Sequence, residues 1–315
     1  MKRLLMLCCA VGFGSFGGRL CAEVRGRMVV VAGLSGTEEI GGEIGRVCAS
    51  WEEAGKRAGL EVVVIGREGG GLKSEFRAAV ESGRRAGGPM WIVLEGHGYA
   101  RREDGYFALR GGDVSGTEIR SWIEVGTGSV VSVLGFSSGG AMLKALSGKG
   151  RLVLSGAATA GEENRIRFGR FLAEAWSREE ADEDGDQQVS LLEAALYAGR
   201  RTRDWYEEKG RILTEHAVWA DESGKVRRFD GVKRRGGRWE AADGGALAFD
   251  RMVLVESEDE RGMSEAQRGL RGELEAEVEK VRGMREELGE AEYYKRLEAL
   301  LLRIRRECLG EKRKP

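Results

Sequence analysis

The sequence is poor in proline, histidine and cysteine, and each shortage excludes something. Only 2 of its 315 residues are proline while 50 are glycine, so glycine must make nearly all of the turns. Two histidines are too few for a three-histidine metal centre. The formal net charge is only −1, from 51 basic and 52 acidic residues. This balance gives no electrostatic basis for binding nucleic acid or an anionic membrane surface.

The N-terminal stretch has the features of a secretory signal peptide. Lys2 and Arg3 precede an apolar run from Leu4 to Phe16, and Leu20-Cys21-Ala22 offers a small-residue cleavage site. The run is too short to span a membrane, and no second hydrophobic span follows it. We therefore predict that residues 1–22 are removed. The mature protein is expected to be periplasmic or extracellular, with no stable membrane insertion.

Three of the five cysteines lie in that N-terminal stretch. Cys48 and Cys308 remain, at the two ends of the mature chain. Two cysteines do not make a disulfide framework, and a single bridge between them is left open.

Short apolar runs alternate with amphipathic segments through the first half of the chain. The predicted strands are 27–32, 60–65, 91–98, 129–134 and 151–155, and the predicted helices between them are 38–59, 72–86 and 117–123. This β-α-β alternation implies an α/β fold in which helices cover both faces of a mostly parallel sheet.

The second half of the chain divides into three parts. Helices are predicted at 168–176 and 190–209, within a main domain that we bound at 23–225. Residues 226–262 are charged and glycine-rich, and we expect a loop with a short strand at 247–255. In 263–315, apolar residues recur at spacings of three and four on both sides of Gly289, which predicts a helical hairpin or coiled-coil arm. The arm either packs on its own domain or binds a helical partner.

Two predicted strands end in small residues, where open α/β sheets place their chemistry. His97 stands between Gly96 and Gly98 after one of them. The turn from Gly135 to Gly140, with sequence GFSSGG, follows the next. Adjacent strands lie about 5 Å apart. A histidine general base and a nucleophile held by this turn would therefore meet.

Taken together, these motifs resemble the legumain–caspase clan of cysteine peptidases, and most closely the exported bacterial members of its legumain-type group. The likeness rests on Gly96-His97-Gly98, Ser138-Gly139 and the strand RLVLSGAAT from Arg151. Further matches are Phe168-Gly169-Arg170-Phe171, the acidic loop at Asp182, Ser190 to Ala194, Thr214 to Ala217, Tyr293-Tyr294 and Leu297 to Leu301. The resemblance implies a caspase-like three-layer sandwich with the helical hairpin appended.

The resemblance also assigns roles to individual residues. In that clan a histidine acts with a cysteine thiolate, and backbone N–H groups of the kind offered by Gly98 hold the oxyanion. Legumain-type enzymes carry Ala-Cys-Glu-Ser-Gly at the turn. The matching residues here, Gly135 to Gly139, place Phe136 at the nucleophile position. A phenylalanine cannot attack a carbonyl, so the chain is predicted to be an inactive homologue that binds a peptide or protein.

Two alternatives stay open. Ser137 is one residue from the nucleophile position, and a slip of the turn would let it act with His97 in a hydrolase. The second alternative is an adaptor that works through the helical arm.

The acidic loop matches the spacing of an EF-hand calcium loop. Asp182, Asp184, Asp186, Ser190 and Glu193 occupy its first, third, fifth, ninth and twelfth places, and Gln188 offers a backbone carbonyl at the seventh. The sixth place, normally glycine, is Gln187, which must then accept a positive φ. A capping box of Ser190 and Glu193 explains part of the pattern without any metal. Calcium therefore remains one of two interpretations.

Overall fold

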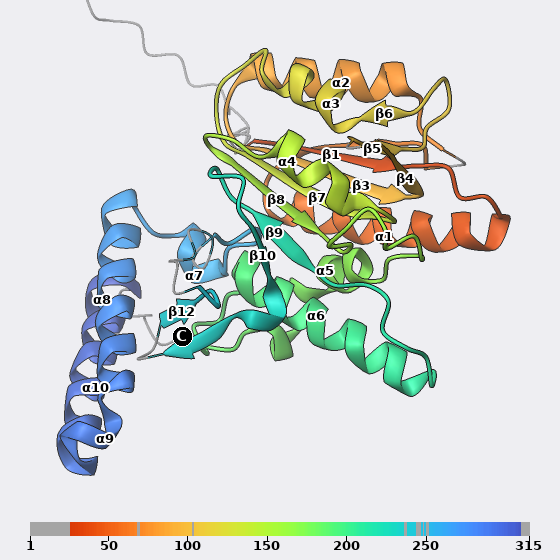
Figure 1. Ribbon diagram of the computed structural model, residues 1–315. Helices are drawn as coiled ribbons and strands as arrows, with labels where there is room; N and C mark the ends of the chain where they lie inside the picture. The colour runs from red at the N-terminus through yellow and green to blue at the C-terminus, as the bar shows by residue number, and fades with distance from the viewer. Residues whose placement is uncertain are drawn as a thin grey trace, which may run out of the picture.

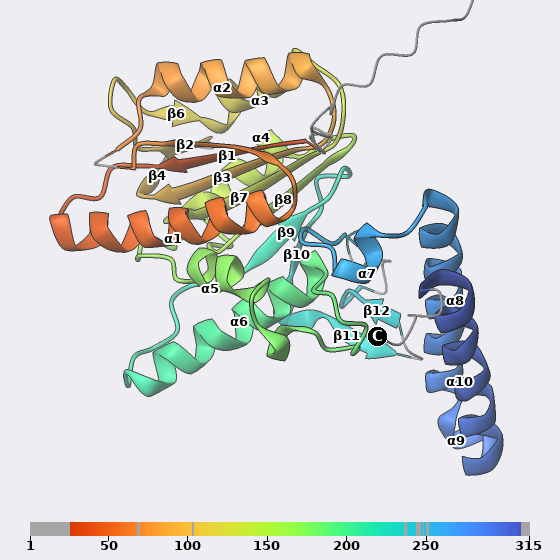
Figure 2. The same cartoon turned by 180° about the vertical axis from the view of Figure 1, so that it is seen from behind.

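The protein is described from a computed structural model, which covers residues 26–67, 70–102, 104–235, 238–243, 247, 249 and 252–309. Figure 1 shows three layers, with α2 and α3 above the central sheet and α1, α5 and α6 below it. The view from behind in Figure 2 shows α1 running along the lower face of the sheet. The predicted signal peptide, 1–22, lies outside the described residues.

The central sheet has seven strands within the described residues, in the order β10-β9-β8-β7-β3-β1-β2. Their bounds are β1 Arg27–Ala32, β2 Glu61–Ile65, β3 Met90–Gly96, β7 Val130–Phe136, β8 Arg151–Ser155, β9 Val218–Ala220 and β10 Val226–Arg228. The five strands β8, β7, β3, β1 and β2 pair in parallel. At the edge beside β8, the strands β9 and β10 add in antiparallel pairing. The predicted α/β class with a mostly parallel sheet is confirmed.

The helices follow the predicted segments closely in the first half of the chain. Their bounds are α1 Glu38–Arg57, α2 Lys73–Ala86, α3 Gly116–Ile123, α4 Leu143–Leu146, α5 Phe168–Ala175, α6 Leu191–Glu208, α7 Glu258–Arg261, α8 Glu265–Gly283, α9 Arg285–Leu288 and α10 Glu290–Ile304. Side-chain caps fix several starts. Ser190 accepts a hydrogen bond from the Glu193 N–H and so begins α6, as the capping-box interpretation predicted.

Both faces of the sheet are buried, which explains why its strands are apolar without alternation. In β1, Met28 and Val30 face the core between the sheet and the helices α1 and α5. Val29 and Val31 face the core between the sheet and the helices α2 and α3. Successive side chains of a strand point to opposite faces, so two separate cores form from one continuous apolar run.

The segment 226–262 differs from its prediction. We expected a loop with strand potential only at 247–255, but β10 joins the central sheet, and β11 Lys233–Arg235 pairs with β12 Arg238–Glu240. Residues 252–255, the described end of the predicted strand, contribute only an isolated bridge between Val253 and Ser190. The prediction was wrong because these short strands are rich in charged residues, as loops are, and because pairing of β10 with β9 and of β11 with β12 supplies what the local sequence does not.

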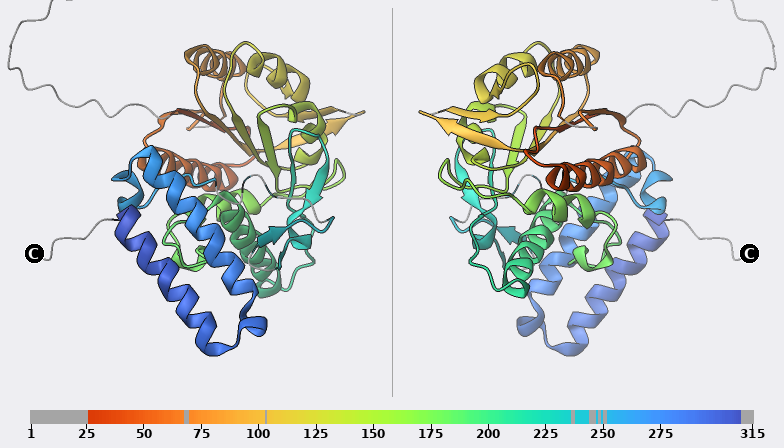
Figure 3. Two further views of the ribbon diagram at one scale, coloured as in Figure 1. Left: turned by 90° about the vertical axis from the view of Figure 1, so that its left-hand side faces the viewer. Right: turned by 90° about the vertical axis from the view of Figure 1, so that its right-hand side faces the viewer.

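The C-terminal helices form the predicted hairpin. Figure 3 shows α8 and α10 side by side, joined through α9, and Leu274, Met263 and Cys308 form their small core. Gly289, with φ 68°, turns the chain between α9 and α10. Cys48 and Cys308 are both buried free thiols, one in α1 and the other in the arm. None of the described helices is long and apolar enough to cross a membrane.

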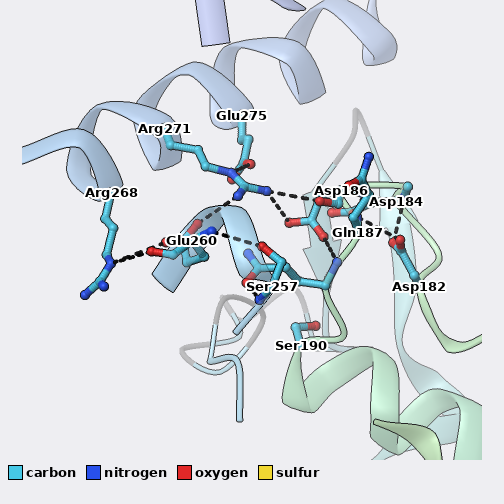
Figure 4. A network of polar contacts seen from close by, with 12 residues as sticks. Asp182, Asp184, Asp186, Gln187, Ser190, Ser257, Glu260, Arg268, Arg271 and Glu275 are labelled. Carbon is cyan, nitrogen blue, oxygen red and sulfur yellow. Dashed lines mark hydrogen bonds and ion pairs between the residues drawn. The ribbon is translucent and has the colours of Figure 1, made fainter. Parts of the chain in front are cut away.

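A buried arginine attaches the arm to the rest of the chain (Figure 4). Arg271 on α8 is 6% exposed and donates to Glu260 Oε2 at 2.7 Å, Glu275 Oε1 at 2.5 Å and the carbonyl of Asp186 at 3.1 Å. Arg282, also on α8, donates to the carbonyl of Asp184 at 3.1 Å. The arm is therefore held against the acidic loop that begins at Asp182.

Loss of this arginine should loosen the arm. Arg271→Met leaves the carboxylates of Glu260 and Glu275 without their buried cation, and breaking such a pair costs on the order of 3 kcal/mol. We expect faster proteolytic cleavage between α6 and α8 in limited digestion. Arg268→Met is the matched control, because Arg268 is more exposed and lies 3.9 Å from its carboxylate partners. Equal cleavage rates in the two variants would contradict the account.

Candidate functional site

His97 lies at the carboxyl end of β3, beside the end of β7. In the parallel register Gly96 is paired with Phe136, so His97 and Ser137 follow on adjacent strands. The ring Nε2 of His97 is 2.9 Å from the carbonyl of Ser35 in the loop after β1. A carbonyl only accepts, so this contact assigns the proton of neutral His97 to Nε2 and leaves Nδ1 as the acceptor.

Phe136 ends β7 with its side chain turned into the core under α2 and α3. It is 0% exposed, and its ring centroid lies 4.9 Å from that of Phe107 on β5, which spans Asp104–Phe107. A Cβ added at Gly98 would overlap the Phe136 ring. The position that the resemblance gives to a nucleophile is thus filled by an aromatic ring packed on the backbone beside His97.

Ser137 is held by the backbone of Gly98. Its hydroxyl donates to the Gly98 carbonyl at 2.9 Å and accepts from the Gly98 N–H at 3.3 Å, and the residue is 4% exposed. Ser138, with φ 60°, takes up the positive φ of the turn and donates to the Ala160 carbonyl at 2.8 Å. The Gly98 N–H that the resemblance assigns to an oxyanion is therefore engaged by Ser137 in this arrangement.

A cavity of about 420 Å³ opens beside His97, between α1 and the segment that leads into α5. Its lining residues include Glu43, Arg46, Glu95, His97, Arg165, Arg167 and Arg170. Arg165 and Arg167 both form ion pairs with the single carboxylate of Glu43 on α1. The cavity is thus framed by several guanidinium groups and fewer carboxylates.

Glu95 lies at the inner end of this cavity, in the middle of the sheet. It is 5% exposed, and its hydrogen-bond partner is the indole N–H of Trp51 at 3.4 Å. A Cβ added at either Gly135 or Gly169 would overlap the Glu95 carboxyl, so these two glycines make its space. Burial raises the pKa of Glu95 to about 8, although the Trp51 hydrogen bond and Arg165 oppose the shift. Glu95 is therefore mostly a neutral acid at pH 7.

Sequence reasoning missed Glu95, Arg165 and Arg167. The signal for Glu95 was present, because a glutamate interrupts the otherwise apolar run WIVLEGHG that ends at His97. A lone carboxyl in a strand that is buried on both faces is an expensive residue and commonly marks a functional site. The two arginines lie in the segment before α5, where charge alone gives no such signal.

The acidic loop brings together part of the predicted calcium set. Ligand oxygens of Asp182, Asp184 and Glu193 lie within 4.8 Å of one another. Gln187 at the sixth place has φ 70°, as calcium-loop spacing requires. The carboxylate of Asp186 instead accepts from the Gln188 N–H and lies 3.6 Å from Arg271.

Ser190, a further predicted ligand, donates from its hydroxyl to Glu193. The side chain of Gln188 accepts from the Ser257 N–H, while the ligand predicted at Gln188 is its backbone carbonyl. Burial and neighbouring carboxylates raise the pKa of Asp184 to about 6 and that of Asp186 to about 7. Carboxylate oxygens are the ligands that calcium prefers, and the three that gather here, from Asp182, Asp184 and Glu193, fit the predicted ion.

Comparison with known proteins gives only distant likenesses of fold. No protein-family model matches the sequence, and no curated protein matches it. Among solved structures, similar folds include the protein GSU0716 from Geobacter sulfurreducens, with a TM-score of 0.41 and 13% identity over 56% of this chain and 89% of that one. Caspase-1 from Spodoptera frugiperda has a TM-score of 0.40 and 9% identity over 63% of this chain and 87% of its own. At these scores nothing about activity follows.

The buried carboxyl of Glu95 should make the protein less stable as pH rises. Its folded-state pKa of about 8 exceeds the ordinary value of 4.5, so the folded state holds a proton that the unfolded state releases. The resulting stabilisation is complete below about pH 4.5 and is lost as pH rises through 8. Glu95→Gln should reduce this loss in the free energy of unfolding by about 1 kcal/mol or more, since a difference of one pKa unit corresponds to about 1.4 kcal/mol. Urea unfolding from pH 5 to pH 9 measures it.

The exposed Glu39→Gln serves as the matched control for that series and should keep the slope of the unmutated protein. A slope that is unchanged in Glu95→Gln would show that Glu95 is already ionised at neutral pH. Glu215, whose pKa burial raises to about 7, should leave a smaller residual slope in the variant.

Calcium should stabilise the protein through the acidic loop. A ligand that binds only the folded state raises the free energy of unfolding according to its concentration over its dissociation constant. At about 10 mM calcium we expect the midpoint of thermal unfolding to rise by a few °C. Asp184→Asn should remove most of that rise, and Glu39→Gln should not. An equal rise in both variants would place calcium elsewhere.

Proposed function

We propose that this chain is an exported homologue of the legumain–caspase peptidases that has lost catalysis and binds a peptide or protein beside His97. The observation that carries the proposal is Phe136, buried at the end of β7 on the strand that adjoins His97. The base position of the resemblance is kept, and the nucleophile position is an aromatic ring. The exported state rests on the N-terminal 22 residues alone.

Peptide hydrolysis of this type needs a nucleophile that His97 activates. The benzyl side chain of Phe136 has no lone pair to attack a carbonyl, and Cys48 lies within α1, where burial raises the pKa of its thiol far above neutral pH. The hydroxyl of Ser137 points to Gly98 rather than to His97. As they are placed, Phe136, Cys48 and Ser137 therefore support the proposed loss of covalent catalysis.

Binding requires less than catalysis, and the cavity remains. Its volume of about 420 Å³ lies within the range of small-ligand pockets, roughly 300–1,000 Å³. It opens at the carboxyl ends of β3 and β7, where open α/β sheets bind their ligands. A peptide side chain is the ligand that fits both this place and the resemblance.

Ser137 stays the alternative nucleophile because it lies against Gly98, the residue after His97. To act, its hydroxyl would have to give up both backbone hydrogen bonds to Gly98 and rotate toward His97. The adaptor alternative has support of another kind, since Tyr294, Leu301 and Leu302 are exposed on α10. The turnover experiment below decides the Ser137 alternative. Loss of binding on deletion of the arm would support the adaptor alternative.

The test is turnover of a mixed fluorogenic peptide library by the mature protein, with and without calcium. We expect no turnover from the unmutated protein. Phe136→Cys should introduce hydrolysis that a second change, His97→Ala, removes, because a thiol beside the histidine restores the pair. Turnover by the unmutated protein that is lost in Ser137→Ala would instead establish a serine hydrolase.

A further inference from the structure

A second cavity, of about 220 Å³, shares no lining residue with the cavity beside His97. It is bounded by α6, by the start of α5, by the segment 213–217 that leads into β9, and by the 3₁₀ turn η3, Phe229–Gly231. Its volume lies below the roughly 300–1,000 Å³ of pockets for drug-sized ligands. The cavity therefore suits a ligand with few atoms.

Part of the lining of this second cavity is apolar. The apolar residues come from four separate parts of the chain and are Phe168, Leu196, Leu213, Ala217 and Phe229. Phe168 and Phe229 are both buried, and their stacked rings have centroids 6.0 Å apart. The hydrocarbon part of a ligand that lay against these side chains would be removed from water, which favours binding.

Apart from Gly199, the other lining residues are polar: Arg200, Thr202, Arg203, Glu215, His216 and Asp230. Both carboxylates among them are already engaged by the protein. Asp230 accepts hydrogen bonds from Arg228 through both of its oxygens. Glu215 accepts from the backbone N–H groups of Arg167 and Phe168 at 2.8 and 3.1 Å. Their charge opposes a ligand that would bring two negative charges of its own.

Two of the three basic lining residues also have partners. Arg200 forms an ion pair with Glu183. The ring Nδ1 of His216 lies 2.9 Å from Glu162 Oε1, and the His216 backbone N–H donates to Glu162 Oε2 at 3.0 Å. Arg203, by contrast, is exposed on α6 and forms no hydrogen bond or ion pair among the described residues. Its guanidinium fork is therefore available to a carboxylate.

Thr202, next to Arg203 on α6, carries a hydroxyl that lacks a partner. The residue is 4% exposed, and its buried Oγ1 has no hydrogen bond within the part of the chain that the structure describes. A threonine on a helix has two accessible rotamers, so a rotation of the side chain exchanges the covered hydroxyl with the methyl group. An unpaired buried hydroxyl is costly, so a ligand that offers it an acceptor would be stabilised.

We propose that this second cavity binds a small monocarboxylate with a compact apolar body, whose carboxylate pairs with Arg203 and accepts a hydrogen bond from Thr202. The apolar body lies against the side chains of Phe168, Leu213 and the other apolar lining residues. A cationic ligand would meet the like charge of Arg203, and a dianion would meet the carboxylates of the wall. The site lies outside the cavity beside His97 and does not rest on the proposed function.

Three probes test the proposed class of ligand. Phenylpropanoate carries one carboxylate on a compact aromatic body, phenylpropanamide is its uncharged near-isostere, and phenyl phosphate brings a second negative charge. Binding to the mature protein is measured by isothermal titration and by saturation-transfer NMR of each probe. We expect the propanoate to bind about ten-fold more tightly than the amide, because the amide cannot form the charge-assisted pair with Arg203. Phenyl phosphate should bind more weakly than the propanoate.

Two variants test the residues that would hold the carboxylate. Arg203→Gln should weaken binding of the propanoate about ten-fold and leave that of the amide unchanged. Thr202→Val keeps the shape of the side chain and removes its hydroxyl, so it should weaken binding of the propanoate several-fold. The same change should not lower the midpoint of thermal unfolding, because the hydroxyl that it removes has no partner among the described residues. A purely structural hydroxyl would give a lower midpoint instead.

Two control variants separate this cavity from other basic sites. Arg211→Gln, an exposed change outside both cavities, should leave all three affinities unchanged. Arg165→Gln removes a guanidinium from the cavity beside His97 and should also leave them unchanged. Equal binding of propanoate and amide, an affinity that falls in Arg165→Gln instead of Arg203→Gln, or no binding of any probe at millimolar concentration would overturn the inference. None of these outcomes bears on peptide turnover, which tests the proposed function.

Discussion

The packing of the Phe136 ring against the backbone of Gly98 is the contact on which this end of the sheet is built. It joins β7 to the residue after His97 and continues to Phe107 on the β5 ribbon, so the core under α2 and α3 extends to the place where a nucleophile would stand. Glycine is required at position 98 because any Cβ would overlap the ring. Ser137 then completes this contact by bonding both backbone groups of Gly98.

The opposite face of the same strand ends is arranged for a different purpose. Glu95 points away from Phe136, toward the core under α1, and two glycines make room for its carboxyl. Trp51, Trp91 and Trp176 gather nearby, with ring centroids 5.3 to 6.5 Å apart. Burial of this carboxyl is costly, and its hydrogen bond from Trp51 offsets part of that cost. The same strand ends thus carry a packed aromatic ring on one face and, on the other, a buried acid beside a cavity lined by arginines.

Much of the fold was predictable because continuous apolar strands and amphipathic helices carry their own signals. His97, the turn after β7 and the capping box at Ser190 were placed correctly for that reason. The strands β10 to β12 were missed, since short charged strands gain their stability from neighbours rather than from local sequence. The cavity was missed because Glu95, Glu43 and Arg165 come from three separate segments. Their meeting depends on helix packing, which no spacing in the sequence expresses.

The central claim is that no residue at the strand ends acts as a nucleophile. The most direct measurement is the intact mass of the mature protein after incubation with a fluorophosphonate and, separately, with a peptidyl acyloxymethyl ketone, with peptide mapping of any adduct. The account predicts that neither reagent modifies a residue at the ends of β3 and β7. A fluorophosphonate adduct on Ser137 that is absent in His97→Ala would contradict the account and assign a working hydrolase.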